Sequence, residues 1–295
     1  MISIIITSFN EPETIGKAID SFLKQDIKEK YELLVVCPDE PTTKVIKKYT
    51  KKYPQIKHIQ DEGKGKSYAI NLLLPKLKGE IIILTDGDVY VSENSVNEIL
   101  KKFEDEKVGC VSGQPLSQNS RENMLGYWSH LLCYAAHRLR KQRDRQDNFL
   151  ECSGYLWAFR NRIIKKFPLD VGEDTIVPIM FFLKGYKIKY APKAGVYVKY
   201  PPKISEFLKQ KRRTVGAHDN IHKYVNLKKI PRMKTFFNEI VEGYTLFFYP
   251  RNIKELLWTF LIFPFRLYIW LNLLFNSYIR KRKYTDAWKR IESTK

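Results

Sequence analysis

Apolar residues in the first part of the chain fall into two alternating patterns. Continuous apolar and β-branched runs are typical of strands buried on both faces of a parallel sheet, and they lie at Ile2–Thr7, Tyr31–Cys37, Ile56–Gln60 and Ile81–Thr85. Between them, apolar residues recur at helical spacing from Asn10 to Gln25, from Thr42 to Lys52 and from Lys66 to Leu77. Strands that alternate with helices form right-handed βαβ units, so we predict a parallel sheet over residues 1–88.

The alternation continues beyond residue 88. Helices are predicted at Ser95–Phe103, Asn119–Arg143, Thr175–Leu183 and Ile204–Ala217, and strands at Val108–Ser112, Cys152–Phe159, Lys187–Ala191 and Gly195–Tyr200. The first helix of the chain is expected to begin with Asn10 as its N-cap and Glu13 closing a capping box. We therefore predict an α/β fold with a Rossmann-like, mostly parallel central sheet flanked by helices.

The C-terminal part differs in character. Residues Leu256–Phe275 are almost wholly apolar, and at about 1.5 Å per residue they could cross the roughly 30 Å core of a bilayer. However, Arg266 near the centre would be costly there and Pro264 would kink the helix. We expect two shorter amphipathic helices in the membrane interface, with a true span or a helix packed within protein as the alternatives. Residues 217–295 are thus predicted to be a helical membrane-association region.

The net charge and the cysteines indicate the kind of binding partner and the redox compartment. The 295 residues carry a formal net charge of +20, which favours an anionic partner such as a nucleotide, a nucleic acid or a membrane surface. The four cysteines are widely spaced and form no zinc-binding pattern, so a reducing cytosolic environment fits best. The N-terminus begins as a strand and lacks the features of a secretory signal.

Two carboxylates follow the most apolar strand. Asp86 and Asp88 are separated only by Gly87, at the carboxyl end of the run Ile81–Thr85. Open α/β sheets bind ligands at this end of their strands, and hard oxygen ligands suit Mg²⁺ or Mn²⁺ beside a phosphate. The alternative is an acidic turn, since Asp-Gly is a common turn pair.

Familiar nucleotide motifs are missing from the chain. The loop Asp61–Lys66 contains Gly63 and Gly65 but forms neither a Walker A motif nor a GxGxxG fingerprint. This weakens the case for a nucleotide hydrolase or a dehydrogenase.

Several ordered motifs together resemble the family 2 glycosyltransferases, which are inverting enzymes of GT-A fold. The resemblance covers residues 1–216 and rests on Thr7-Ser8-Phe9-Asn10-Glu11, Lys66-Ser67-Tyr68-Ala69-Ile70-Asn71, Asp86-Gly87-Asp88, Gly172-Glu173-Asp174 and Gln210-Lys211-Arg212-Arg213. The third of these is similar to the DxD motif, and the last to the start of QxxRW.

The resemblance implies a nucleotide-sugar donor, Mg²⁺ or Mn²⁺, and a role for each matching residue. Asp174 would be the catalytic base, Glu173 and Gln210 would contact the acceptor, and the metal would be held by Asp88 with Asp86. Donor contacts would come from Thr7, Phe9, Asn10, Glu11, Asp39, Lys66, Asp86, Gly87, Arg212 and Arg213.

Each of these assignments has a structural alternative. Asp174 could simply cap a helix, Lys66 could be an exposed first-turn residue, and Asn10 and Glu11 could only begin their helix. Arg212 and Arg213 could be solvated surface or could contact lipid headgroups. The nearby histidines are a further, weaker candidate for a metal site, and they are His218 and His222.

Two departures from the family pattern bear on the substrates. The second strand ends in Cys37-Pro38-Asp39-Glu40 rather than an Asp-Asp-Gly-Ser-like turn, which leaves uracil and guanine both open as the donor base. Thr214 stands where the Trp of QxxRW would be, which argues for transfer of one or a few sugars.

We expect the sugar to pass to a hydroxyl or phosphate of a membrane lipid, such as a polyprenyl phosphate or a glycolipid, on the cytoplasmic face of the cell membrane. The alternatives are a soluble or polysaccharide acceptor, a nucleotidyltransferase, a catalytically silent scaffold and a basic nucleic-acid-binding protein. The carboxylates Asp86 and Asp88 at the end of a buried strand do not support the nucleic-acid-binding alternative.

Overall fold

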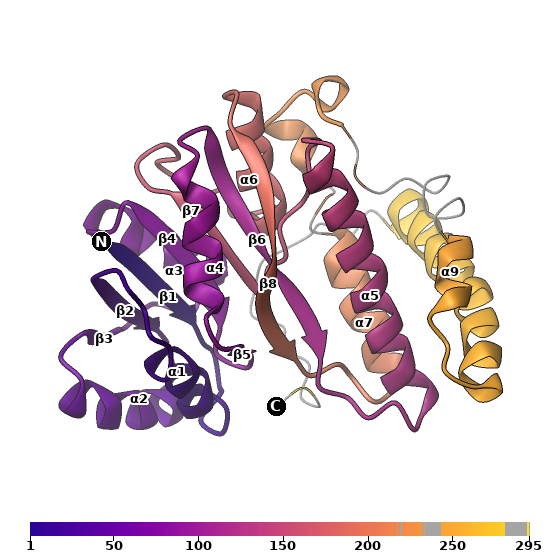
Figure 1. The fold of residues 1–295 in the computed structure, drawn as a ribbon, viewed down its shortest axis with the longest axis horizontal. Coiled ribbons are helices and arrows are strands. Elements are labelled where there is room, and N and C mark those ends of the chain that lie inside the picture. The colour runs from indigo at the N-terminus through magenta and orange to yellow at the C-terminus, as the bar shows by residue number, and fades with distance from the viewer. Residues whose placement is uncertain (217, 219, 232, 234–242, 281–293, 295) are drawn as a thin grey trace.

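The structure is a computed structural model that describes residues 1–216, 218, 220–231, 233, 243–280 and 294. Its centre is an eight-stranded sheet with the order β3-β2-β1-β4-β7-β6-β8-β5. Helices cover both faces of this sheet (Figure 1). The predicted α/β fold, with a mostly parallel central sheet, is therefore confirmed.

The strands are β1 (Ile2–Thr7), β2 (Tyr31–Val36), β3 (Ile56–Ile59), β4 (Ile81–Asp86), β5 (Tyr90–Val91), β6 (Val108–Ser117), β7 (Leu156–Arg160) and β8 (Lys187–Val198). The α-helices are α1 (Ile15–Leu23), α2 (Glu40–Lys52), α3 (Lys66–Leu73), α4 (Ser95–Leu100), α5 (Met124–Arg145), α6 (Glu173–Leu183), α7 (Ile204–Gly216) and α9 (Ile253–Arg280). Short 3₁₀ turns lie at Leu74–Lys76, Lys101–Glu104, Ile221–Lys223, Leu227–Lys229 and Tyr244–Phe248.

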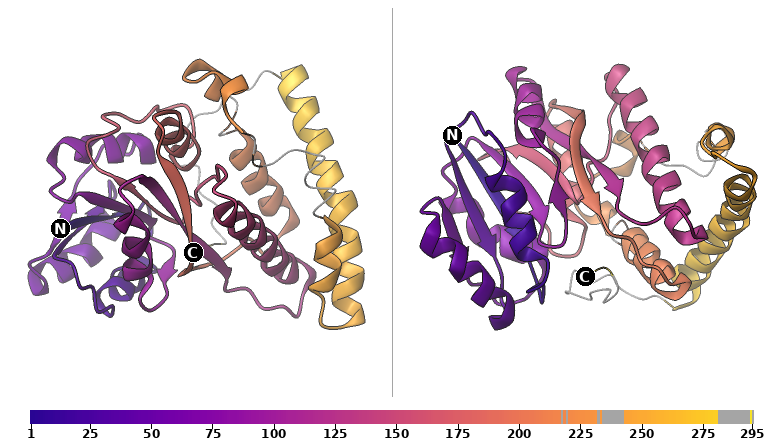
Figure 2. Two further views of the ribbon diagram at one scale, coloured as in Figure 1. Left: turned by 45° about the horizontal axis from the view of Figure 1, so that its top comes forward. Right: turned by 60° about the horizontal axis from the view of Figure 1, so that its bottom comes forward.

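Four neighbouring strands of the sheet run parallel, and they are β3, β2, β1 and β4. Their apolar runs are buried on both faces, because alternate residues of each strand belong to different hydrophobic clusters. Helices α1, α2 and α4 pack on one face, whereas α3 and α6 pack on the other (Figures 1 and 2). This arrangement aligns the carboxyl ends of β1 and β4, where Thr7 pairs with Asp86.

Strand β7 is antiparallel to β4, with Thr85 opposite Leu156. The chain therefore enters β7 at the edge of the sheet where β4 ends. Residues that precede Leu156 are placed beside Asp86 by this reversal, and the Thr85 hydroxyl donates to the carbonyl of Tyr155 at 2.7 Å.

The start of α1 was predicted wrongly. The helix begins at Ile15 and its N-cap is Thr14, whereas Asn10 adopts a left-handed backbone conformation with φ 54°. The reason is a tertiary contact, because the amide of Asn10 donates to a carboxylate oxygen of Asp39 at 2.6 Å. That contact turns the chain before the helix can begin.

Three other boundaries differ from the prediction. The two strands expected at Lys187–Ala191 and Gly195–Tyr200 are one strand, β8, which pairs with β6 on either side of an irregularity. On β6, the pairing continues to Ser117, well beyond the predicted end. Helix α5 starts at Met124 rather than Asn119, because the Asn123 side chain accepts from the amide of Gly126 and caps it.

Helix α9 is one helix of 28 residues, so the expected pair of shorter helices is not observed. Its inner face packs on α5, where Thr259 and Ile262 are buried. Arg121, which precedes α5, makes a bidentate ion pair with Glu255 of α9 at 2.8 and 3.0 Å. These tertiary contacts favour a continuous helix through Pro264. Within the described part of the chain, no helix combines the length and apolar character that a membrane crossing requires.

Candidate active site

Predicted site residues from distant parts of the sequence converge where β1 and β4 end and β7 begins. The loop after β1, the turn after β4 and the first turn of α6 all reach this edge of the sheet. This is the position at which open α/β sheets bind ligands.

The turn after β4 is packed tightly against the loop after β1. The Thr7 hydroxyl donates to Asp86 Oδ1 at 3.2 Å, and the amide of Gly87 donates to the carbonyl of Thr7 at 2.9 Å. A Cβ atom at Gly87 would lie 2.3 Å from Glu11 Oε2, so only glycine fits there. Glu11 is itself buried and accepts from the Ser8 hydroxyl at 2.7 Å. Glu11 therefore packs directly against the Asp86–Asp88 turn.

Lys66 is the centre of a buried charge cluster. Its ammonium group lies 2.7 Å from Asp86 Oδ1 and 2.9 Å from Glu173 Oε1, and it donates to the carbonyl of Gly154 at 3.1 Å. Burial alone would lower the pKa of Lys66, but the two carboxylates outweigh burial and raise the pKa above its usual value. The side chain is only 12% exposed, so the alternative of an exposed first-turn lysine is wrong.

Asp174 lies in the first turn of α6, beside Gly154. A Cβ atom at Gly154 would be 2.8 Å from Asp174 Oδ2, so the missing side chain leaves room for the carboxylate. Burial raises the pKa of Asp174 to about 6, and the neighbouring Glu173 adds to this effect, whereas Lys66 opposes it. A carboxylate with a pKa close to neutrality is suited to proton transfer.

Asp39 is engaged by backbone groups through both of its oxygens. Besides the Asn10 amide, the carboxylate accepts from the amide of Thr42 at 3.0 Å and so caps α2. Burial would raise the pKa of Asp39, but the hydrogen bonds from Thr42 and Asn10 lower it. The residue therefore fixes the loop that carries Phe9, which is half-buried.

Helix α7 reaches the site through Gln210. Its amide donates to the Tyr155 hydroxyl at 3.5 Å, and Arg213 lies close enough to this tyrosine to act on it electrostatically. The side chain of Arg212 lies outside the described residues. His218 is 3.9 Å from Glu151 and also acts on Asp174.

Sequence reasoning missed Tyr155 and Gly154 as site residues. Tyr155 is under the electrostatic influence of both Asp88 and Asp86, and burial raises its pKa well above the usual value. The available signal was Gly154 within a predicted strand, since a glycine there often marks a close approach of backbone to another group.

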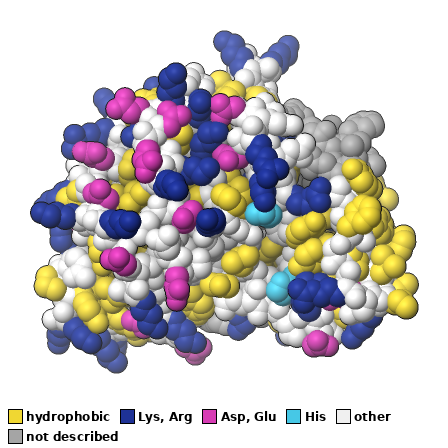
Figure 3. Space-filling view, in the orientation of Figure 1, with side chains coloured by type: hydrophobic (Ala, Val, Ile, Leu, Met, Phe, Trp, Pro, Cys, Tyr) yellow, Lys and Arg dark blue, Asp and Glu magenta, His cyan; other side chains and the backbone are white. Residues whose placement is uncertain are grey.

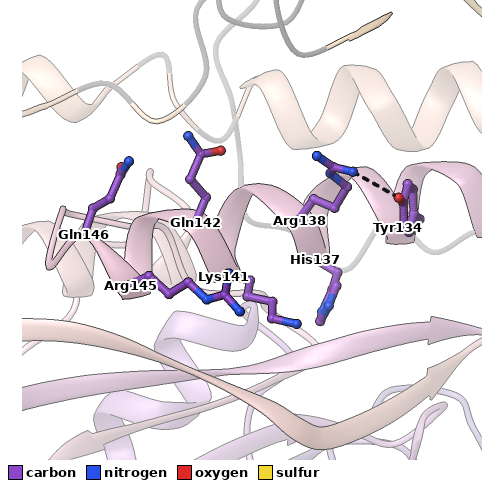
Figure 4. Close-up of a pocket in the computed structure, with 7 residues that line it drawn as sticks. All are labelled: Tyr134, His137, Arg138, Lys141, Gln142, Arg145 and Gln146. Carbon is purple, nitrogen blue, oxygen red and sulfur yellow. Dashed lines mark hydrogen bonds between the residues drawn. The ribbon is translucent and has the colours of Figure 1, made fainter. Parts of the chain in front are cut away.

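A cavity of about 490 Å³ adjoins Asp88 on the α1 side of the site. A larger cavity, of about 630 Å³, lies along α5 and is lined by Tyr134, His137, Arg138, Lys141, Gln142, Arg145 and Gln146 (Figure 4). None of the predicted site residues lines the larger cavity, so it is separate from the Asp86–Asp174 site.

Among the described residues, no three His, Cys, Asp or Glu side chains are grouped so that they could hold a metal ion by themselves. Asp86 is already engaged by Lys66 and Thr7, which leaves Asp88 as the carboxylate better placed to bind a cation. Mg²⁺ commonly uses one or two carboxylates together with substrate phosphates and water. The residues therefore fit a cation that is completed by a diphosphate.

Comparison with known proteins agrees with this geometry. Residues 1–217 match the sequence profile described as glycosyltransferase like family 2. A poly-beta-1,6-N-acetyl-D-glucosamine synthase of Staphylococcus aureus is 24% identical over 81% of this chain and 61% of its own length. An N-acetylglucosaminyltransferase of Rhizobium meliloti is 24% identical over 72% of this chain and 54% of its own length. The chain thus spans less than two thirds of these relatives.

Solved structures show the same fold. The mannosyltransferase PcManGT from Pyrobaculum calidifontis, in complex with GDP-Man and Mn²⁺, has a TM-score of 0.59 at 19% identity, covering 88% of this chain and 72% of its own. TarS 1-349 of S. aureus, in complex with UDP-GlcNAc, has a TM-score of 0.51 at 18% identity, covering 83% and 79% of the two chains.

Proposed function

The chain belongs to the glycosyltransferase like family 2, and on this premise we propose that it is an inverting glycosyltransferase that moves a sugar from a nucleotide-diphosphate sugar to a membrane lipid or glycolipid. The observation that carries the proposal is the position of Asp174, a half-buried carboxylate of raised pKa, next to the cluster of Lys66, Asp86 and Glu173. Residues 1–216 would form the catalytic domain and residues 217–295 the membrane-association region.

The proposed reaction is a single displacement at sugar C1. Asp174 accepts the proton of the acceptor hydroxyl while the hydroxyl oxygen attacks C1 from the face opposite the leaving group. The bond between C1 and the diphosphate oxygen breaks, and Arg213 would contact the departing phosphates. A cation held by Asp88 would offset the negative charge that develops on them. A hydroxyl acceptor fits better than a phosphate, because a phosphate oxygen needs no base at neutral pH.

Lys66 and Glu173 have supporting roles in this proposal. Lys66 fixes the orientation of Asp86 and keeps positive charge next to the donor site. Glu173 holds Lys66 from the other side and raises the pKa of Asp174 through its charge. The donor and acceptor halves of the site therefore share one ammonium group.

The donor can be identified by a screen. PcManGT was solved with GDP-Man and TarS with UDP-GlcNAc, so UDP- and GDP-sugars with Mn²⁺ or Mg²⁺ are the candidates. Purified full-length protein should hydrolyse one donor slowly and transfer its sugar to membrane lipid extracts. Transfer to soluble glycans with none to lipids would refute the lipid acceptor, whereas binding to RNA or DNA without donor turnover would refute the enzyme.

Replacing Asp88 with asparagine tests the cation site. Since Lys66 pairs with Asp86 and Asp88 lines the adjoining cavity, Asp88 is the proposed cation ligand, and the Mn²⁺-dependent part of nucleotide affinity should fall by at least about tenfold. Titration calorimetry with the nucleoside diphosphate, with and without Mn²⁺, measures this part. The control is Glu93→Gln, which changes an exposed acid nearby. Equal Mn²⁺ dependence in the Asp88 variant and wild type would contradict the assignment.

The outer face of α9 supports the membrane part of the proposal. Large apolar side chains on it are exposed at a spacing of three and four residues, and they are Ile253, Leu257, Phe260, Leu261, Leu267, Tyr268 and Leu271. Figure 3 shows hydrophobic side chains gathered on the side of the molecule formed by this helix. An apolar stripe on a helix of a strongly basic protein suits the interface of an anionic membrane.

Substituting glutamate for Leu257 should lower binding to anionic vesicles by roughly tenfold, because burial of a leucine side chain contributes about 1.5–3 kcal/mol. Co-sedimentation with vesicles of phosphatidylglycerol and phosphatidylcholine measures the effect. Leu183→Glu is the matched control, since Leu183 is also an exposed helical leucine but lies on α6. If both variants bind vesicles equally, α9 is not the membrane-binding face.

A further inference from the structure

Besides the segment that carries Asp88 and Thr294 near the C-terminus, three parts of the chain line the cavity beside Asp88. The start of α1 contributes Thr14 and Lys17, the loop after β6 contributes Asn119, and the segment after β8 contributes Lys199 and Tyr200. Its volume of about 490 Å³ is large enough for a ligand group of several atoms. The proposed reaction assigns no role to Thr14, Lys17 or Lys199.

Thr14 carries an unusual hydroxyl. The residue is only 6% exposed and lines the cavity, yet its Oγ1 atom has no hydrogen-bond partner among the described residues. As the N-cap of α1 it also makes no side-chain capping bond. A buried hydroxyl without a partner costs free energy, and a ligand atom that accepts its proton would recover this cost once the side chain turns toward the cavity.

The surroundings of Thr14 favour a negatively charged ligand atom. The amide of Ile15 already donates to the carbonyl of Glu11 at 3.0 Å, but the helix dipole still places partial positive charge at the start of α1. Lys17, one turn further along α1, and Lys199 from the opposite wall line the same cavity. The acidic neighbours are Glu13, which is exposed, and Asp88, whose charge the bound cation would offset.

The walls of the cavity are held in place by hydrogen bonds of their own. The Asn119 side chain donates to the carbonyl of Tyr200 at 2.9 Å and accepts from its amide at 2.8 Å. This pair joins the loop after β6 to the segment after β8. The cavity is therefore formed before a ligand enters it.

An aromatic contact joins the wall of the cavity to the segment that carries Gly154. The Tyr200 ring, which lines it, lies 6.3 Å from the Tyr155 ring, and Tyr155 directly follows the glycine beside Asp174. A ligand group bound at Thr14 would thus be close to both the donor phosphates at Asp88 and the path to the base.

We propose that this cavity binds a phosphate group of the acceptor, with Thr14, Lys17 and Lys199 as its contacts. The inference rests on the proposed glycosyltransferase function. The phosphate anchors the acceptor and a hydroxyl of the same molecule reaches Asp174. No bond to the phosphate forms or breaks. The acceptor class is accordingly an anionic phospholipid or a phosphate-bearing glycolipid.

The test measures binding without turnover. Dihexanoyl phosphatidylglycerol, dihexanoylglycerol and glycerol 1-phosphate are titrated into the full-length protein, alone and with saturating nucleoside diphosphate and Mn²⁺. Phosphatidylglycerol is expected to bind at least about tenfold more tightly than dihexanoylglycerol, since hydrogen bonds to a charged group are stronger than those to a neutral group. Thr14→Val and Lys17→Met should each remove most of this difference.

The controls lie on the neighbouring helices. Lys24→Met changes a lysine at the other end of α1, and Thr50→Val changes a threonine of α2, both outside the cavity. Affinities equal to wild type are expected for these two variants. Tight binding of glycerol 1-phosphate would identify the phosphate alone as the recognised group, whereas weak binding would show that the acyl chains are also needed.

Three results would overturn the proposal: equal affinity for the neutral diacylglycerol, wild-type affinity in the Thr14 and Lys17 variants, or displacement of phosphatidylglycerol by the nucleoside diphosphate. The last would mean that the cavity is part of the donor site. A protein that binds phosphatidylglycerol through Thr14 but transfers no sugar would instead contradict the proposed function and leave the anion site standing.

Discussion

Asp174→Asn is expected to lower kcat/KM by between about a hundredfold and ten-thousandfold, the usual contribution of a positioned general base. An asparagine amide fits beside Gly154 but cannot accept the acceptor proton. Donor binding should stay close to that of wild type, because the donor contacts lie on the other side of Lys66. The loss should therefore be in transfer and not in nucleotide affinity.

The same variant should be more stable than wild type. The pKa of Asp174 is raised from 3.8 to about 6 in the folded chain, so the stability that it contributes below pH 3.8 is lost as the pH rises through 6. At pH 7.5 the ionised carboxylate opposes folding by up to about 3 kcal/mol, at 1.36 kcal/mol per pKa unit. Asparagine carries no charge, so it removes this unfavourable contribution and raises the free energy of unfolding.

Kinetics and urea unfolding at pH 7.5 check both effects. In wild type, kcat/KM should fall about tenfold per pH unit below pH 6, since the base is then protonated. The control is Asp170→Asn, because hydrogen bonds from Lys223 and Tyr224 outweigh burial and lower the pKa of Asp170, so this variant should lose stability. Near-normal turnover by Asp174→Asn would show that another group is the base.

Lys66→Met should be the most destabilising single change in the site. It keeps the length of the side chain but leaves the carboxylates of Asp86 and Glu173 without their shared cation. Removing one partner of a buried ion pair costs about 3–5 kcal/mol. Loss of the ammonium group should also abolish measurable binding of the nucleotide-sugar.

Chemical unfolding and nucleotide titration measure these two losses. Lys64→Met is the matched control, because Lys64 is paired with Glu62 on the surface and should be replaceable without a measurable effect. The double variant Lys66→Met/Glu173→Gln should be more stable than Lys66→Met, since it removes the carboxylate charge of Glu173 that Lys66→Met leaves without its cation. It should remain inactive, because the ammonium group is still missing. Wild-type stability in Lys66→Met would contradict the description of the cluster as buried and mutually paired.

The strands of the parallel half were predictable because their apolar runs are continuous and end in polar turns. The grouping of Asp86, Lys66 and Asp174 followed from motif order. However, Lys66 forms an ion pair with Glu173 and donates a hydrogen bond to the carbonyl of Gly154, and both partners are distant in the sequence. Local patterns do not encode such contacts. Thr14 was missed for a related reason, because the turn imposed by Asp39 on Asn10 moved the start of the helix.

The C-terminal helix shows the other limit of sequence reasoning. Pro264 and Arg266 suggested a break, since local propensity disfavours both in an apolar helix. The contacts of Thr259 and Ile262 with α5, and the ion pair of Glu255, outweigh that propensity. Where tertiary contacts decide the boundary of an element, a single sequence does not reveal them.

The ion pair between Arg121 and Glu255 has a practical consequence for handling the protein. The loop that carries Arg121 also carries Asn119, so one end of it forms a wall of the cavity while the other is fastened to α9. A detergent that pulls α9 away from α5 would therefore distort the cavity beside Asp88 and leave the contacts of Lys66 intact. On the proposed function, a solubilised preparation that still binds nucleotide but no longer transfers sugar should recover transfer in lipid nanodiscs.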